Sequence, residues 1–228
     1  MTSPRNPSAF ADRTTDPAAH DHPDRAGRDS NGFARVVNLS DAIFAIAMTL
    51  LVLTVDVPDV AEDDLAAALL RDLPQLGAYA LAFALVASQW YAHRKLFERL
   101  AFVEPGLVII NFVILGVVAL APFPTSILGS YPTATAAIAP FLVVFIVLTG
   151  GYIALIVRSQ TIGAWTEPLP TVAYRRAVQA FTAGALVLVA GVAISFWLPV
   201  LALGMALISN VPTIAVLRSV PARYRHWF

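Results

Sequence analysis

The sequence has no cysteine and little charge. Without cysteine, the 228-residue chain forms no disulfide, no thiolate metal site and no cysteine nucleophile. Asp, Glu, Lys and Arg make up only 13% of the residues, whereas a soluble domain carries roughly 25%. Fifteen basic residues balance fifteen acidic ones, so no excess of positive charge points to a nucleic-acid partner.

Apolar residues are abundant instead. Hydrophobic residues make up 58% of the chain, and its mean hydropathy is +0.71. A water-soluble fold of this size cannot hide that much apolar surface. Backbone groups in lipid must form their hydrogen bonds within the chain, which helices do. The sequence therefore predicts an all-α integral membrane protein with several spans.

The charges divide the chain into three segments. Residues 1–32 hold nine charges and four prolines but no Val, Ile or Leu, so we expect a disordered cytoplasmic tail. Residues 33–218 hold the long uncharged stretches and are predicted to form one six-helix transmembrane channel unit. Residues 219–228 are predicted to be a short basic cytoplasmic C-terminus.

Six helices are expected because one span needs roughly 20 mostly apolar residues. Proline and glycine mark the turn between the third and fourth helices at 122–125 and 129–132, and the last pair is broken near 197–199. The predicted helices are 36–55, 73–92, two within 105–157 and two within 177–217.

The basic residues predict the orientation. With six helices, fourteen of the fifteen basic residues fall on one side, while residues 56–72 on the other side hold six acidic ones. The positive-inside rule then places both termini in the cytoplasm of a multi-pass cell-membrane protein. Fourteen arginines against one lysine, with abundant Ala and Val, indicate a GC-rich bacterial genome.

Polar residues open the first helix, where each needs a partner or a function. Ser40 or Asp41 would serve as an N-cap in one interpretation. In the other, Asp41 pairs with Arg35 in a buried network. The two are six positions apart, about 240° around a helix, so a direct bond needs a wrapped side chain or a partner from another helix.

Partners for this network are expected at similar depth. Trp90 and His93 share a face of the second helix, and Asn111 lies near the start of the third. Taken singly, these are an interfacial tryptophan, a loop histidine and an ordinary helix–helix hydrogen bond. Their common depth favours one structural polar network.

A second feature of the first helix is a stripe formed by Ile46, Thr49 and Leu53 at i, i+3 and i+7. Such spacing usually means a core or lipid-facing stripe. The alternative is a pore lining, with apolar rings on either side of a hydroxyl ring.

The segment Arg35–Asp41 resembles the R-x-x-x-F-S-D motif of the transmembrane protein 175 family, the endolysosomal potassium channel and its bacterial relatives. Leu39 stands where the motif has Phe. Residues 42–53, 90–93 and 122–125, together with Asn111, continue the resemblance, which covers about 33–129. Beyond that, only hydropathy and helix spacing agree.

The resemblance implies a potassium-permeable cation channel that lacks the usual carbonyl filter. The first helix of each copy in a homotetramer would line the pore, with weak selectivity for potassium over sodium and other monovalent cations. Ile46, Thr49 and Leu53 would be its constriction and selectivity layers. No cofactor, metal or catalytic residue is implied. The residues implied to hold the first helix in place are Arg35, Ser40, Asp41, Trp90, His93 and Asn111.

Two other classes of protein could use the polar residues of the first helix. A membrane enzyme would use Asp41, His93 and Arg35 as an acid–base set, but the chain has no recognisable catalytic motif, and we expect no enzyme. A proton- or cation-coupled transporter would use Asp41 as its carrier. The absence of an internal repeat counts against that alternative.

Overall fold

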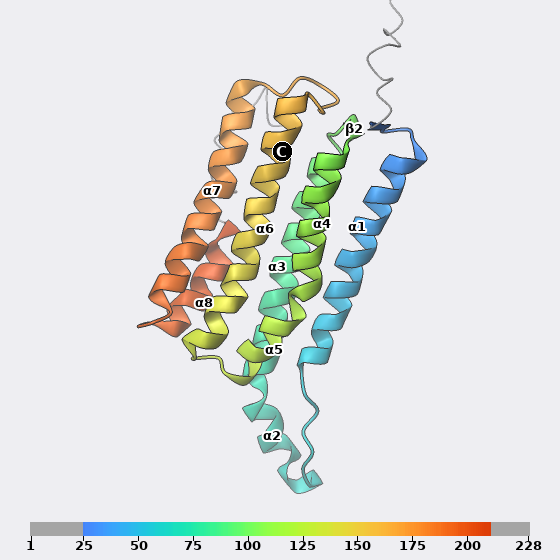
Figure 1. Cartoon of the computed structure of the whole chain (residues 1–228). Helices are drawn as coiled ribbons and strands as arrows, with labels where there is room; N and C mark the ends of the chain where they lie inside the picture. The colour runs from blue at the N-terminus through green and yellow to red at the C-terminus, as the bar shows by residue number, and fades with distance from the viewer. Residues whose placement is uncertain (1–24, 211–228) are drawn as a thin grey trace, which may run out of the picture.

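A computed structural model of the protein describes residues 25–210. Residues 1–24 of the predicted tail 1–32, and the whole predicted C-terminus 219–228, lie outside the described residues. Residues 25–32, the rest of the predicted tail, hold β1, the N-cap Ser30 and the first two residues of α1. The long helices run side by side, with α1 at one edge of the bundle and α7 at the other (Figure 1). The elements are β1 Ala26–Gly27, α1 Asn31–Leu50, η3 Leu51–Thr54, η4 Glu62–Asp64, α2 Leu65–Arg71, α3 Leu73–Phe97, β2 Phe102–Val103, α4 Pro105–Leu120, α5 Pro122–Ser130, α6 Thr135–Ile162, α7 Thr171–Ile194 and α8 Pro199–Ile208.

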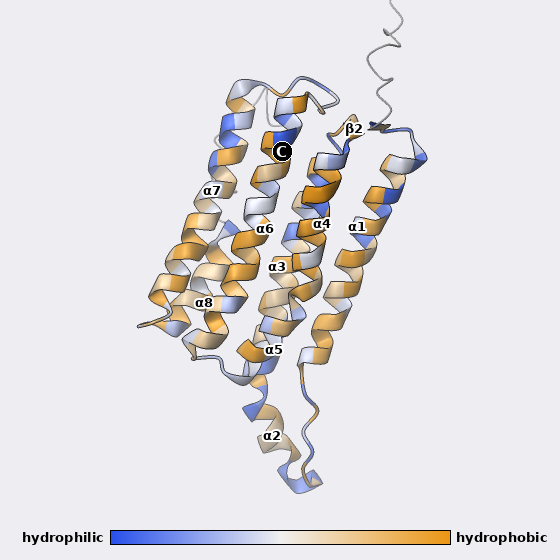
Figure 2. Ribbon diagram, in the orientation of Figure 1, coloured by the Kyte–Doolittle hydropathy of each residue, from blue (hydrophilic) through white to orange (hydrophobic). Residues whose placement is uncertain are grey.

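Within residues 25–210, four stretches of helix are long and apolar enough to cross a membrane: α1 with η3, α4 with α5, α6, and α7. A fifth is formed if η4–α2 and α3, which meet at 47°, count as one span. The expected sixth helix is described only as α8, which is too short to span. Figure 2 shows hydrophobic residues along the long helices and hydrophilic ones around α2.

The expected turn at 122–125 is wrong. Pro122 begins α5, and the chain continues from α4 as a single span of 26 residues. Proline is tolerated in the first turn of a helix because the amide hydrogen it lacks has no partner there. The connection to α6 comes only after Ser130, at the second of the two predicted positions. The break near 197–199 does separate α7 from α8.

The second membrane helix is longer than predicted. Its counterpart, α3, runs to Phe97, so Arg94 and Lys95 lie in its last turn rather than in a loop. Basic side chains are favourable there, because the last turn is the negative end of the helix dipole. His93 therefore has a fixed place on a helix.

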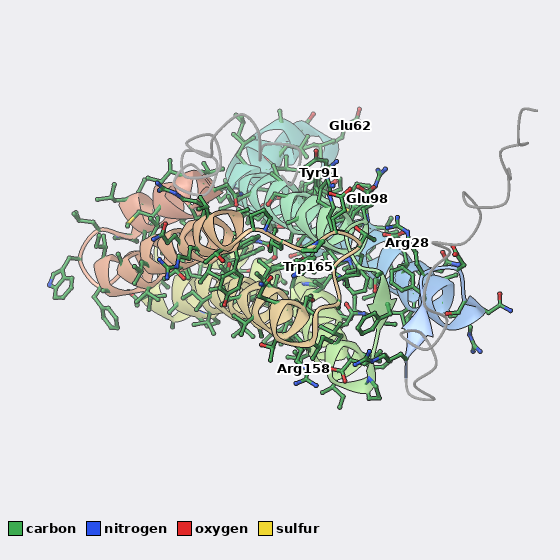
Figure 3. The ribbon with its side chains drawn as sticks, turned by 90° about the horizontal axis from the view of Figure 1, so that it is seen from above. Arg28, Glu62, Tyr91, Glu98, Arg158 and Trp165 are labelled. Carbon is green, nitrogen blue, oxygen red and sulfur yellow. The ribbon has the colours of Figure 1, made fainter. Side chains whose placement is uncertain are left out.

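Backbone pairing joins three segments at the end where α1 begins. β1 pairs antiparallel with β2, and Leu100 forms a bridge to Trp165 in the α6–α7 connection. The Arg28 guanidinium also donates to the Glu98 carbonyl oxygen at 2.7 Å. Figure 3 looks down on this end and labels Arg28, Glu98 and Trp165. The segment before α1 is thus tied to the connection between α3 and α4.

Burial differs between the helices. α6 packs on both α4 and α7, whereas α1 packs mainly on α4 and α3. In the most apolar 18-residue stretch of each span, 50% of the α6 residues are buried, against 22% for α1 with η3. Much of α1 is therefore left for lipid or for another copy of the chain.

Candidate functional site

α1 begins nine residues before the polar pair that was considered as its cap. The N-cap is Ser30, whose hydroxyl oxygen accepts from the Phe33 amide at 3.2 Å. Ser40 and Asp41 therefore lie inside the helix, and the N-cap interpretation is wrong for both. Inside a membrane helix, a hydroxyl can bond to a carbonyl of its own helix or to a neighbouring helix, whereas a carboxylate needs another partner or water.

Three buried residues from three helices form a hydrogen-bonded chain, which we call the Ser40 cluster: Ser40 on α1, Asn111 on α4 and His93 on α3. The Asn111 amide nitrogen donates to the Ser40 hydroxyl at 3.0 Å. The Asn111 oxygen lies 2.7 Å from His93 Nε2. Because that oxygen can only accept, His93 carries its proton on Nε2. None of the three residues is more than 2% exposed.

Aromatic rings enclose the histidine of the cluster. The His93 ring stacks on Phe97 with centroids 4.3 Å apart, and Phe44 of α1 lies 5.5 Å away. Tyr152 of α6 approaches edge-on at 6.4 Å and donates its hydroxyl to the Gln89 carbonyl oxygen at 2.8 Å. Such packing fixes the ring and keeps water from its hydrogen bond.

A second contact joins α1 to α3, nearer the surface of the protomer. The Trp90 indole donates to Asp41 Oδ1 at 2.8 Å. The Arg94 guanidinium lies 5.9 Å above the Trp90 ring and also donates to Glu98 at 2.8 Å, which lowers the pKa of the Glu98 carboxyl. Asp41 is thus held by tryptophan, while the arginine on the neighbouring turn is occupied by Glu98.

Arg35 does not join these contacts. Within residues 25–210 its side chain is exposed and makes no hydrogen bond or ion pair, so the expected pairing with Asp41 is absent from the protomer. The reason is geometric: α1 is a regular helix here, and positions six apart point about 240° from one another.

The predicted stripe lies on the opposite side of α1 from the Ser40 cluster. Ile46 and Leu53 are 56% and 74% exposed, and Thr49 is exposed between them. The Thr49 hydroxyl donates to the Ile46 carbonyl oxygen at 2.8 Å, which leaves its lone pairs facing outward. Leu53 lies in η3 rather than in α1, so its position on the stripe departs from ideal α-helical spacing.

Only the structure shows that Tyr152, Phe44 and Phe97 pack around the histidine of the cluster and that β1 is paired. A tyrosine in the middle of an apolar span is a usable signal, because its hydroxyl needs a partner in lipid. The phenylalanines look like any membrane residue. A two-residue strand has no sequence pattern.

A family model described as "Endosomal/lysosomal potassium channel TMEM175" matches residues 35–122. A crystallised TMEM175 homologue from Chamaesiphon minutus, described as lysosomal potassium-selective, superposes with a TM-score of 0.70 at 26% identity. That match covers 84% of this chain and all of the homologue. Over residues 35–122 this chain is similar to the TMEM175 family.

Two curated relatives match somewhat less than half of the chain. A potassium channel of Streptomyces collinus is 37% identical over 102 residues, 44% of this chain and 50% of the relative. A potassium channel of Chamaesiphon minutus is 35% identical over 100 residues, 42% of this chain and 49% of the relative. The matched part thus spans about half the length of these TMEM175 relatives.

Two more distant matches complete the comparison. The human endosomal/lysosomal proton channel TMEM175 is 26% identical over 134 residues, 58% of this chain and 27% of the human protein. A crystallised variant of the potassium channel MtTMEM175 shares the fold with a TM-score of 0.59 at 17% identity, over 86% of this chain and 97% of the other.

The part that matches the TMEM175 family model contains the whole candidate site. It runs from Arg35 through α1, α3 and α4 to Pro122, so it includes the Ser40 cluster, the Asp41–Trp90 contact and the exposed stripe. Tyr152, on α6, lies outside it. The relatives carry channel names, and ion channels are not a class of enzyme.

Proposed function

We propose that this protein is a potassium-permeable cation channel of the cell membrane, with a pore lined by α1 from each of four copies. The observation that carries the proposal is the family match, which begins at Arg35 and includes both faces of α1. Two of the curated relatives are named as potassium channels.

Burial of α1 supports its place at the pore. It lies at the edge of the protomer and is the least buried of the four long spans. Its exposed face carries a hydroxyl between two apolar side chains, Ile46 and Leu53. Four copies arranged around an axis would turn each position into a ring, and apolar rings gate by excluding water.

Weak selectivity follows from the chemistry of these rings. A cation that leaves water at Ile46 finds no oxygen there and then only one layer of Thr49 hydroxyls. Potassium-selective filters instead replace the hydration shell with several stacked rings of carbonyl oxygens. One hydroxyl layer therefore discriminates poorly between potassium and sodium.

The Ser40 cluster and the Asp41–Trp90 contact would hold the pore helix in place. Both join α1 to α3, and the cluster also joins it to α4. We therefore assign Ser40, Asp41, Trp90, His93 and Asn111 a structural role. The transporter alternative built on Asp41 is not favoured, because the matching relatives are named as channels.

Reconstitution in planar bilayers tests the proposal. We expect unitary cation currents and, with potassium on one side and sodium on the other, a reversal potential displaced only modestly toward the potassium equilibrium potential. A measured subunit count of four would support the tetramer. Saturable flux without unitary currents would contradict the channel and favour a transporter.

Cysteine labelling tests the orientation. The chain has no cysteine of its own, so a cysteine introduced at Asp63, in the acidic segment before α2, is a unique target. It should react with an impermeant reagent in intact cells, whereas Arg28→Cys, at the other end of the bundle, should not. The reverse pattern would contradict cytoplasmic termini.

A further inference from the structure

Arg35 lies on the same face of α1 as the predicted pore layers. At 100° per residue, Arg35 is within about 20° of Ile46 and about 40° of Thr49 around the helix axis. All three are exposed, and α1 is one regular helix across them. If Ile46 and Thr49 face the pore axis, Arg35 faces it as well.

Among residues 25–210, no acidic side chain pairs with Arg35. Three other arginines at this end do have acceptors: Arg28 donates to the Glu98 carbonyl oxygen, and Arg94 and Arg158 are paired with glutamates. Arg35 has none among residues 25–210 and instead borders a shallow hollow beside Val36, Asn38 and Leu39. No described carboxylate therefore offsets the field of its guanidinium.

Leu39 and Ala42 lie between Arg35 and Ile46 on this face of α1. Both are exposed, and each is within about 40° of Arg35 around the helix axis. Eleven residues of helix place Arg35 about 16 Å from Ile46 along the axis.

We propose that Arg35 forms a cationic ring at the inner mouth of the pore and limits the entry of cations from the cytoplasm. This inference rests on the proposed function. Four like charges around a narrow mouth lower the local concentration of cations, and the effect weakens as salt screens them. The ring would act on permeation, in contrast to the structural role expected for Arg35 from the family motif.

Acidic residues follow the opposite end of α1, so the two mouths of the proposed pore would carry opposite charge. The chain that follows η3 carries six acidic residues between positions 56 and 72, and the Asp56 amide is tied to Gln75 of α3 at 2.7 Å. Acidic charge near the outer mouth concentrates cations there, while Arg35 depletes them inside. Inward cation current should therefore exceed outward current.

Single-channel current–voltage curves in symmetrical potassium chloride test this proposal. At about 0.1 M salt, where charges act over about 10 Å, inward conductance of the unmodified channel should exceed outward conductance roughly two- to fivefold. At about 1 M, where the range is about 3 Å, the ratio should approach one. A linear curve at the lower salt concentration would overturn the proposal without any variant.

Substitutions then assign the effect to one residue. Arg35→Gln should bring the ratio close to one, and Arg35→Lys should preserve it. Arg175→Gln is the matched control, because Arg175 is an exposed arginine at the same end but on α7. In Arg35→Cys, a positively charged thiol reagent added from the cytoplasmic side should restore the rectification, and a negatively charged one should reverse it.

The remaining outcomes distinguish a failure of the Arg35 proposal from a failure of the proposed channel function. Suppose that changing the charge at position 35 leaves the ratio of inward to outward conductance unchanged, while Ile46→Asn alters conductance. Then α1 lines the pore but Arg35 does not face it. If Arg35→Gln weakens the tetramer, Arg35→Lys restores it and the ratio never changes, Arg35 pairs with a carboxylate of another copy. If Ile46→Asn also leaves conductance unchanged, the pore assignment itself fails.

Discussion

Two hydroxyl groups on α1, nine residues apart, have opposite surroundings. Ser40 and Thr49 each donate a hydrogen bond to a backbone carbonyl of the preceding turn, at 2.8 Å in both cases. The Ser40 oxygen is fully buried and accepts from Asn111. The Thr49 oxygen is exposed and accepts from no side chain in residues 25–210.

The difference shows how one helix can be fixed on one side and available on the other. A buried polar group without a partner costs about 1–3 kcal/mol, so the Ser40 side of α1 fits only one arrangement of α3 and α4. The Thr49 side is not specified by this protomer. It fits lipid, another copy of the chain or a permeating ion, and we propose the ion.

Asn111→Leu should have the largest effect on the buried side. Leucine fits the volume but leaves Ser40 and His93 without their shared partner, so we expect a loss of about 2 kcal/mol in unfolding free energy. Thermal unfolding of the purified protein measures it. Asn38→Leu, the same change on the exposed face of α1, should cost well under about 1 kcal/mol.

Equal losses for the two asparagine variants would mean that the Ser40 cluster contributes little to holding α1. The Ser40 and Thr49 sides of α1 would then differ only in how exposed they are. Unaltered conductance in the surviving Asn111→Leu channels is expected in either case, because Asn111 is buried on α4, away from the proposed pore.

Ile46→Asn should have the largest effect on the exposed side. A polar ring admits water at the constriction, and removing about 1 kcal/mol from the barrier raises unitary conductance about fivefold. Stability should change little, since Ile46 is already 56% exposed. Single-channel recording and thermal unfolding on the same preparation measure both quantities.

Leu186→Asn is the matched control for this prediction. Leu186 is a 62% exposed aliphatic residue on α7, at the far edge of the protomer from α1. It should leave unitary conductance unchanged. If Ile46→Asn behaves like Leu186→Asn, the exposed stripe faces lipid.

The sequence was sufficient for the class of protein and for most of the spans. Long uncharged stretches determine membrane helices, because charge in lipid is so unfavourable. The error at Pro122 arose because proline both ends helices and begins them, and only the structure shows which it does. The predicted sixth helix runs past the described residues, so the count of six stays a prediction.

The polar residues were identified by type more readily than by partner. Ser40, His93 and Asn111 could be grouped from their common depth in the membrane, and the structure brings them together. Arg35 was grouped with them on the same evidence, but the turn of the helix points it elsewhere. The depth of a residue in the membrane follows from its position in the sequence. The direction of its side chain depends also on where the helix begins and on whether it stays regular.

Trp90→Phe tests the second contact between α1 and α3. It removes the indole donor to Asp41 and keeps an aromatic ring for Arg94. Because Asp41 is exposed and water can replace the bond, we expect a loss of about 1 kcal/mol or less in unfolding free energy. Asp41→Asn retains an acceptor oxygen and should lose less still; a loss as large as that of Asn111→Leu would show that the contact is shielded from water.

Small effects should also come from the two hydroxyl groups themselves, and they should differ in kind. Thr49→Val is nearly isosteric and removes only the oxygen that a passing cation could use. We expect stability within about 0.5 kcal/mol of the unmodified protein and conductance lowered about twofold, with altered selectivity between potassium and sodium. Ser40→Ala should do the reverse, since it leaves the Asn111 amide without an acceptor and costs about 1 kcal/mol while permeation stays the same. Unfolding curves and bi-ionic reversal potentials for both variants compare the two sides of one helix directly. If Thr49→Val instead lowers stability and leaves currents unchanged, its hydroxyl serves packing between copies, and the oxygen layer must be sought elsewhere on α1.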